Sequence, residues 1–211
     1  RNLHSRNDLA QNWGPSSSDG GSPGAPNSTR EVNVAPFIEN VSHHPAVPTP
    51  QDLVLIRARL TDDLSSPVHG VVHHRISAVT PGPFTVTAMR DDGLGGDEVA
   101  QDNIHTAVLP ARPEGTVVEF YVEAFDRTLG RTWPGPSGPA GTQEANLLYQ
   151  VDSEQPSGRT PFYRLILPAG ELDEFLNISF DSEEGQTNAS FNATFIAGLD
   201  GRLSIYYRGG M

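Results

Sequence analysis

The sequence predicts a mainly β protein whose ordered centre is an antiparallel β-sandwich. Hydrophobic and polar residues alternate with a period of two along several short segments, among them LVLIRARL at residues 53–60 and VVEFYVEAF at residues 117–125. This alternation is typical of strands with one buried face. The chain also has 21 glycines and 18 prolines among 211 residues, a content that favours many short strands and turns over long helices.

Seven segments between residues 35 and 152 carry this strand pattern. The first, residues 35–50, is an edge strand closed by prolines, which fit sheet edges because they donate no ladder hydrogen bond. The other six are residues 52–63, 68–77, 84–93, 104–111, 115–126 and 144–151. Seven strands in roughly 115 residues is the size of an immunoglobulin-like or fibronectin type III-like domain. We therefore expect an immunoglobulin-like antiparallel β-sandwich over residues 35–152.

The segments on either side of residues 35–152 differ from them in composition and in hydrophobic pattern. Residues 1–33 are polar and predict a disordered N-terminal tail, since they bury too little apolar surface to offset their ordering entropy. Trp13 is its expected anchor. Residues 153–160 predict a linker. Residues 161–211 predict an incomplete α+β segment with a strand at 162–168, a short helix at 169–177 and a hairpin at 192–211.

The C-terminal hairpin is expected to be loosely packed, because two or three strands and one helix are too little for an independent core. Its apolar side chains are expected to be exposed with nothing to cover them. These are Phe195, Ile196, Ile205 and Tyr207.

Charge and composition argue against several classes of function. The formal net charge of -12 argues against nucleic-acid binding, which needs clustered basic side chains. The sequence contains no lysine, which removes Schiff-base chemistry and the phosphate-binding lysine of P-loop proteins and kinases. No apolar run approaches the roughly 20 residues of a membrane span. The absence of cysteine excludes disulfides, and an exported protein without them fits a bacterial envelope.

The segment MRDDGLGGDEVAQDNIH, residues 89–105, concentrates acidic residues and glycines. Ca²⁺ takes six to eight oxygen ligands, so its aspartates are the candidate metal ligands. The segment lacks the spacing of an EF-hand and its closing glutamate. Paired carboxylates for glycosidase chemistry are less favoured still, since no aromatic sugar platform surrounds them. Asp and Gly are also ordinary turn formers. We favour a polar connection between strands, with a Ca²⁺ site as the alternative, at Asp91, Asp92, Asp97 and Asp102.

Two histidine pairs are candidates for zinc binding, and one tryptophan is a candidate for ligand binding. Neighbouring side chains on a strand point to opposite faces, so residues 73–74 cannot close one zinc site together. We expect His74 to share the inner face with Ile76 as a hydrogen-bonded histidine of the core or its rim. The pair at residues 43–44 is not expected to bind zinc either. Trp133, within RTWPGPSGPAG, is expected in a loop, as a ligand-binding tip or as a lid over the sandwich end.

Residues 89–110 followed by residues 115–131 resemble the immunoglobulin-like module that stands beside CotH kinase-like domains. Such modules occur in large envelope or secreted proteins of bacteria such as planctomycetes. Two positions depart from the family pattern, where Asn103 replaces the usual Gly and His105 the usual Tyr. The matching positions are Met89, Asp91, Asp92, Gly93, Gly96, Asp97, Asp102, Thr106, Ala107, Pro110, Gly115, Tyr121, Ala124 and Asp126.

The flanking segments are similar to neighbours of that module. TPFYRLILPAGELDEFLN and NATFIAGLDGRLSIYYRGG, at residues 160–177 and 192–210, resemble the opening of the CotH kinase-like domain. Residues 1–28 resemble the tail of a lamin-tail domain. The resemblance thus covers three pieces in order: the end of one domain (1–33), a complete module (35–152), and the start of another domain (161–211).

The resemblance implies a non-catalytic spacer or interaction module of an extracellular or bacterial cell-envelope protein. Its expected partner is the remainder of its own CotH-like chain, with an envelope or extracellular protein or a glycan as further candidates. CotH relatives are atypical kinases whose nucleotide-contacting lysine and metal-binding acids lie past the strand ending near Gly210. No catalytic residue and no cofactor is therefore assigned here. The alternatives are an adhesin-like module that binds Ca²⁺ or glycans, and the accessory half of an atypical kinase with its active site beyond Met211.

Overall fold

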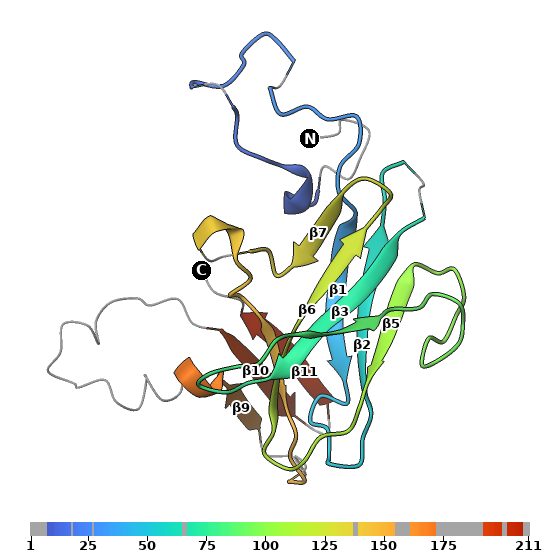
Figure 1. The fold of residues 1–211 in the computed structure, drawn as a ribbon, viewed down its shortest axis with the longest axis vertical. Coiled ribbons are helices and arrows are strands. Elements are labelled where there is room, and N and C mark those ends of the chain that lie inside the picture. Colours follow the sequence, from blue (N-terminus) through green and yellow to red (C-terminus); the bar gives the residue numbers. More distant parts are fainter. Residues whose placement is uncertain are drawn as a thin grey trace, which may run out of the picture.

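The computed structural model describes residues 8–17, 19–26, 28–64, 67–136, 139–154, 161–171, 192–199 and 202–208, and every structural statement below concerns these residues. The fold is mainly β, with 42% strand and 5% helix, and its sheets are antiparallel. Two sheets form a β-sandwich and a third sheet packs beside it (Figure 1). Among the described residues, no helix is long and apolar enough to cross a membrane.

The first sheet has the strand order β1-β2-β5. Its strands are β1 (Phe37–His44), β2 (Val54–Thr61) and β5 (Ile104–Leu109). The second sheet has the order β4-β3-β6, and the far side of β6 pairs with two strands in turn. Its strands are β3 (His69–Ile76), β4 (Thr85–Ala88), β6 (Val117–Phe125), β7 (Gly130–Trp133) and β8 (Leu147–Gln150).

The strand order is that of an immunoglobulin-like sandwich in which the fourth strand joins the sheet of the third and sixth. All seven predicted strands are present. An eighth, β7, was not predicted, because GRTW is too short to establish a period of two. Trp133 was expected in a loop and is instead the last residue of β7, where it pairs with Val122 and is 43% exposed. The short 3-10 turn η2 (Pro139–Gly141) lies between β7 and β8.

The core of the sandwich consists of the inward faces that the alternation predicts. Side chains from β2, β3, β6 and β8 form one buried cluster, with Phe120 and Leu60 both at 0% exposure. His74 lies on the inner face of β3, as predicted, and is 3% exposed. Ile76 follows on the same face but lies at the strand end, where it is 47% exposed. Glu119, on the outer face of β6, is nonetheless buried because Arg75 and Asn146 cover it.

The third sheet has the order β11-β10-β9. It contains β9 (Phe162–Ile166), β10 (Ala193–Leu199) and β11 (Arg202–Arg208). One face packs on the outer side of β8 and on Val47, which follows β1. The expectation of an uncovered hairpin is therefore wrong for Ile196, at 0% exposure, and for Ile205 and Tyr207, which pack against buried clusters. Phe195 is 37% exposed, as expected. Residues 169–171 are helical, and the rest of the predicted helix lies outside the described residues.

The described part of the N-terminal tail contains one 3-10 turn, η1 (Ala10–Asn12), and no other regular element. Trp13, the expected anchor, is 51% exposed. Gln11 instead hydrogen-bonds both backbone groups of Ile38, and Asn12 is buried. The predicted disorder at residues 1–7, 18 and 27 falls outside the described residues.

Candidate functional site

The connection between β4 and β5, residues 89–103, passes the outer face of the first sheet, where Gly96 lies close to Leu55 and Val108. Arg90 forms a β-bridge with Thr106, which fixes the start of the loop against β5. Gly96 then passes close to β2 with φ +93°, where a Cβ would lie 2.7 Å from Cδ2 of Leu55. Glycine is required here for both reasons, since other residues rarely adopt this φ and have no room for a side chain.

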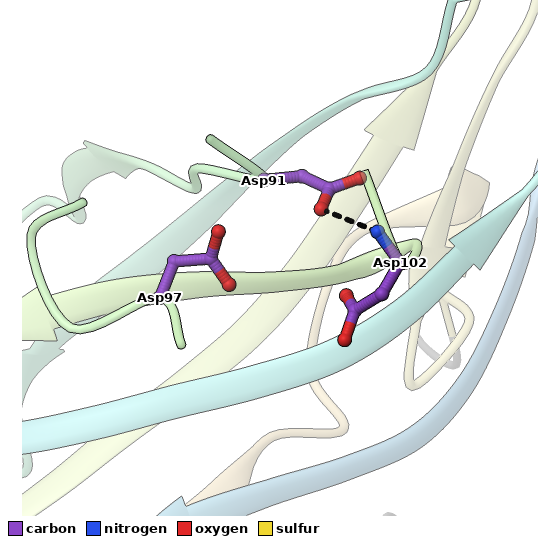
Figure 2. A group of neighbouring side chains, drawn as sticks. All are labelled: Asp91, Asp97 and Asp102. Carbon is purple, nitrogen blue, oxygen red and sulfur yellow. Dashed lines mark hydrogen bonds between the residues drawn. The ribbon is translucent and has the colours of Figure 1, made fainter. Parts of the chain in front are cut away.

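Three of the four predicted ligands converge in this loop. Figure 2 shows Asp91, Asp97 and Asp102 around a common space, and one carboxylate oxygen from each lies within 4.8 Å of the others. Asp97 is 7% exposed and the other two are partly buried. This is the one group of three or more His, Asp or Glu ligands found among the described residues.

The fourth predicted ligand, Asp92, does not join this group. Its carboxylate is paired with the guanidinium of Arg90 at 2.6 Å, and this hydrogen bond is the main cause that lowers the pKa of Asp92. The sequence could not show that Asp91 is a candidate ligand and Asp92 is not. The two residues are adjacent and have the same local composition, and they differ only in the direction in which the loop points their side chains.

The three converging carboxylates all accept backbone hydrogen bonds. Asp91 accepts from the N–H groups of Asp102 and Asn103, at 3.1 and 3.2 Å. Asp97 accepts from Gly93 at 2.6 Å, and Asp102 accepts from Ile104 at 2.8 Å. Carboxylates that cap backbone N–H groups stabilise turns. These bonds explain why a loop of this composition adopts one conformation, and they agree with the favoured interpretation of a polar connection.

A groove of about 980 Å³ adjoins the loop. It lies where the ends of β2, β4 and β6 meet the beginning of β3 and β5, and its lining contains both apolar and polar side chains. Leu60, Met89 and Phe125 belong to its apolar lining, and Asp91 and His105 belong to its polar lining.

The predicted histidines have structural partners. The ring of His73 stacks on Tyr121 with centroids 4.4 Å apart, and its Nε2 lies 2.7 Å from a carboxylate oxygen of Glu123. His74 contacts the hydroxyl of Thr87 at 3.1 Å, and burial lowers the pKa of His74. Neither residue belongs to a group of metal ligands within the part of the chain that the structure describes.

His43 has a role that sequence reasoning missed. It is 3% exposed, its Nδ1 lies 2.5 Å from the hydroxyl of Tyr207, and its Nε2 lies 3.0 Å from the carbonyl of Ala46. With Nε2–H donating to that carbonyl, Nδ1 accepts from the tyrosine hydroxyl. Burial is the main cause that lowers the pKa of His43 to about 4, so the ring is neutral at pH 7. The only local signal for its burial was the two-residue spacing from Val41, which places both side chains on the same face of β1.

Comparison with known proteins adds no relative: no family model matches the sequence, and no curated protein matches it at a significant level. Placement of the chain in a family therefore depends on the motifs and on their order.

Proposed function

We propose that this chain is a non-catalytic spacer and interaction module of a secreted or cell-envelope CotH kinase-like protein of bacteria. In this role the sandwich holds the opening strands of the CotH-like domain, β9 to β11, in a fixed orientation. The order of the three motif regions supports the family. The packing of β9–β11 on the sandwich supports the fixed orientation, and this packing is the observation that carries the proposal.

Apolar packing joins the third sheet to the sandwich. Ile196 on β10 and Ile166 on β9 are almost fully buried against Leu148 on β8 and against Val47. Fully burying one such side chain contributes about 1.5–3 kcal/mol. Four buried side chains at one interface are enough to oppose free movement of a small sheet about a linker.

Polar contacts give this interface a single geometry. The hydroxyl of Thr194, at 0% exposure, accepts a hydrogen bond from the backbone N–H of Leu148 at 3.1 Å. Arg164 on β9 pairs with Asp152, just after β8, at 2.6 Å. Buried polar groups that are hydrogen-bonded penalise every other arrangement of the two sheets, because shifting the sheets would leave them unsatisfied.

The outer face of the third sheet carries exposed aromatic and aliphatic side chains. Tyr163 is 68% exposed, Leu165 58%, Phe195 37% and Tyr206 59%. The three rings are neighbours, with centroids 5.9 and 6.3 Å apart along the row. A contiguous apolar face of this kind usually marks an interaction surface. We assign it to the remainder of the CotH-like domain, whose opening strands it belongs to by resemblance.

Spin-label distances test the fixed orientation. Because the chain has no cysteine, paired cysteines give specific labels at Val86, exposed on β4, and at Ser204, exposed on β11. The control pair, Arg59→Cys with Val86→Cys, lies within the sandwich. We expect distance distributions of similar width for both pairs. A broad distribution confined to the Val86–Ser204 pair would show a flexible tether and reject the proposal.

The family assignment has a separate test in the coding sequence that follows residue 211. A lysine-bearing strand and later paired acidic residues would support a CotH kinase-like domain, with the present chain as its accessory half. A stop codon shortly after Met211 would reject that assignment and leave the sandwich itself as the functional unit.

A Ca²⁺-binding, adhesin-like module is the second candidate, and the convergence of Asp91, Asp97 and Asp102 favours it. Three carboxylates supply up to six oxygens, which matches the lower limit of Ca²⁺ coordination. Millimolar Ca²⁺ should then raise the melting temperature of the wild type and of Asp92→Asn, but not of Asp97→Asn. No rise in the wild type would eliminate this candidate. Its glycan-binding form would use the same loop together with Trp133, which ends β7 and is 43% exposed.

A further inference from the structure

One side of the sandwich is closed by side chains from outside it. Strand β1 is an edge of the first sheet, and β7 with β8 forms an edge of the second. These edges meet along a seam, where β1 contacts β6 and β7. Gln11, from the N-terminal turn, and Tyr207, from β11, each reach a residue of β1 and a residue of the second sheet at this seam.

Gln11 occupies the position that a neighbouring strand would take beside β1. Its Nε2 donates to the carbonyl of Ile38 at 2.6 Å, and its Oε1 accepts from the N–H of Ile38 at 3.0 Å. Arg131 on β7 donates to the same Oε1 at 3.0 Å and to the backbone carbonyl of Gln11 at 2.8 Å. The guanidinium of Arg131 also lies over the ring of Phe37, 5.3 Å from its centroid. One amide thus connects the two sheets.

Tyr207 makes the corresponding connection farther along β1. Its hydroxyl contacts His43, and its ring meets Phe120 of β6 edge to face, with centroids 6.1 Å apart. Tyr149 of β8 also packs on His43, at 5.6 Å. Burial raises the pKa of the Tyr207 hydroxyl, so it stays protonated and able to donate.

Between Ile38 and His43, the pairing of β1 with β2 is interrupted. The register runs from Glu39 opposite Arg59 directly to Ser42 opposite Arg57, which leaves a bulge in β1. Asn40, within the bulge, has φ 53°. A bulge interrupts the ladder of hydrogen bonds. Contacts across the seam, at Ile38 on one side of the bulge and at His43 on the other, add to the pairing of β1 with β2.

We infer that Gln11 and Tyr207 form a two-point clamp on β1, through which the segment before the sandwich and the sheet after it stabilise each other's attachment. Loss of either contact frees part of a strand that has a neighbour on one side only, and strands of this kind open as cooperative units. The inference goes beyond a spacer role, because the clamp links the two ends of the module. It holds whichever domain the third sheet belongs to.

Amide hydrogen exchange on the full chain tests the clamp, with the Ile38 amide as reporter and the Val122 amide as reference for global opening. One hydrogen bond contributes about 0.5–1.5 kcal/mol, which corresponds to roughly a two- to tenfold change in exchange. Gln11→Ala should accelerate the Ile38 amide by about this factor. Tyr207→Phe, which removes only a hydroxyl, should accelerate the same amide at unchanged Val122 exchange.

The matched controls are Tyr206→Phe, whose ring points outward on the same strand, and Gln51→Ala, at an exposed turn. Both should leave the Ile38 amide unchanged. Because linkage is reciprocal, Gln11→Ala should also accelerate the Leu148 amide, which reports on docking of β10. An Ile38 amide unaffected by Tyr207→Phe would overturn the inference. Equal acceleration at Ile38 and Val122 would overturn it too, by showing loss of global stability alone.

These outcomes are separate from the test of fixed orientation. Narrow spin-label distance distributions, together with Ile38 exchange that does not respond to Tyr207→Phe, would support the spacer proposal and reject the clamp. Broad distances would reject both, because Ser204 and Tyr207 lie on the same strand, β11.

Discussion

The hydroxyl of Tyr207 lies 2.5 Å from Nδ1 of His43, although the two residues are 164 positions apart in the sequence. The imidazole is buried among Phe120 and Tyr149, with its other nitrogen on the carbonyl of Ala46. A charged ring would lose its hydration at this place, so the folded state holds His43 neutral. This pair fastens the C-terminal sheet to the first strand of the sandwich, and it makes the stability of the chain depend on pH.

Acidification should destabilise the chain in a window set by His43. Its pKa falls from 6.5 to about 4 on folding, so between these values the unfolded state binds the proton and the folded state does not. Stability therefore decreases as the pH is lowered from about 6.5 to 4, by roughly 1.4 kcal/mol per pH unit for one such group. Urea unfolding across this range measures the slope.

The matched variants for this prediction are His43→Gln and His74→Gln. His43→Gln should flatten the slope, because glutamine does not titrate. His74→Gln should remove a smaller part, since burial lowers the pKa of His74 in the same direction. A slope unchanged in His43→Gln would contradict the assignment.

Phe120→Ala should cost roughly 3–5 kcal/mol of unfolding free energy, the usual loss for a buried phenylalanine. Phe120 is 0% exposed at the centre of the sandwich and contacts His43, Tyr149 and Tyr207. Phe195→Ala, at an exposed position of β10, is the control and should cost much less. Chemical denaturation of both variants decides the point, and similar losses would place Phe120 outside the core.

Gly96→Ala should destabilise the chain by about 1 kcal/mol or more, because φ +93° disfavours any side chain and the new Cβ would meet Leu55. Gly82→Ala is the control, since Gly82 has no atom within 4 Å of its Cβ position and no positive φ. Thermal melts of the two variants provide the comparison. Equal melting temperatures would argue against the described path of the loop along the first sheet.

Thr194→Val should weaken docking of the third sheet by about 1–3 kcal/mol, because the buried N–H of Leu148 would lose its acceptor without any change of volume. Thr85→Val, on the exposed face of β4, is the matched control and should be nearly neutral. Exchange of the Leu148 amide gives a local readout and denaturation a global one. An unchanged Leu148 amide in Thr194→Val would show that the two sheets are not joined there.

Local pattern alone determined most of the sandwich. Val54, Ile56 and Leu60 are buried as their alternation predicts, because a strand assigns successive side chains to opposite faces whatever lies nearby. The acidic loop was also located from composition, since Asp and Gly concentrate where the backbone turns. Its convergence could not be predicted: Asp91, Asp97 and Asp102 meet while Asp92 turns to Arg90, and only the path of the loop fixes these directions.

Tertiary contacts alone determine how the segments before and after the sandwich pack against it. Nothing local to Gln11 indicates a partner at Ile38, and nothing local to Tyr207 indicates His43. The hairpin by itself is too small to cover its apolar side chains. Its inner face is buried because β8 and the chain after β1 present a complementary surface, which exists only once the sandwich has formed. Strand identity is a property of neighbouring residues, whereas closure of the seam depends on contacts between distant ones.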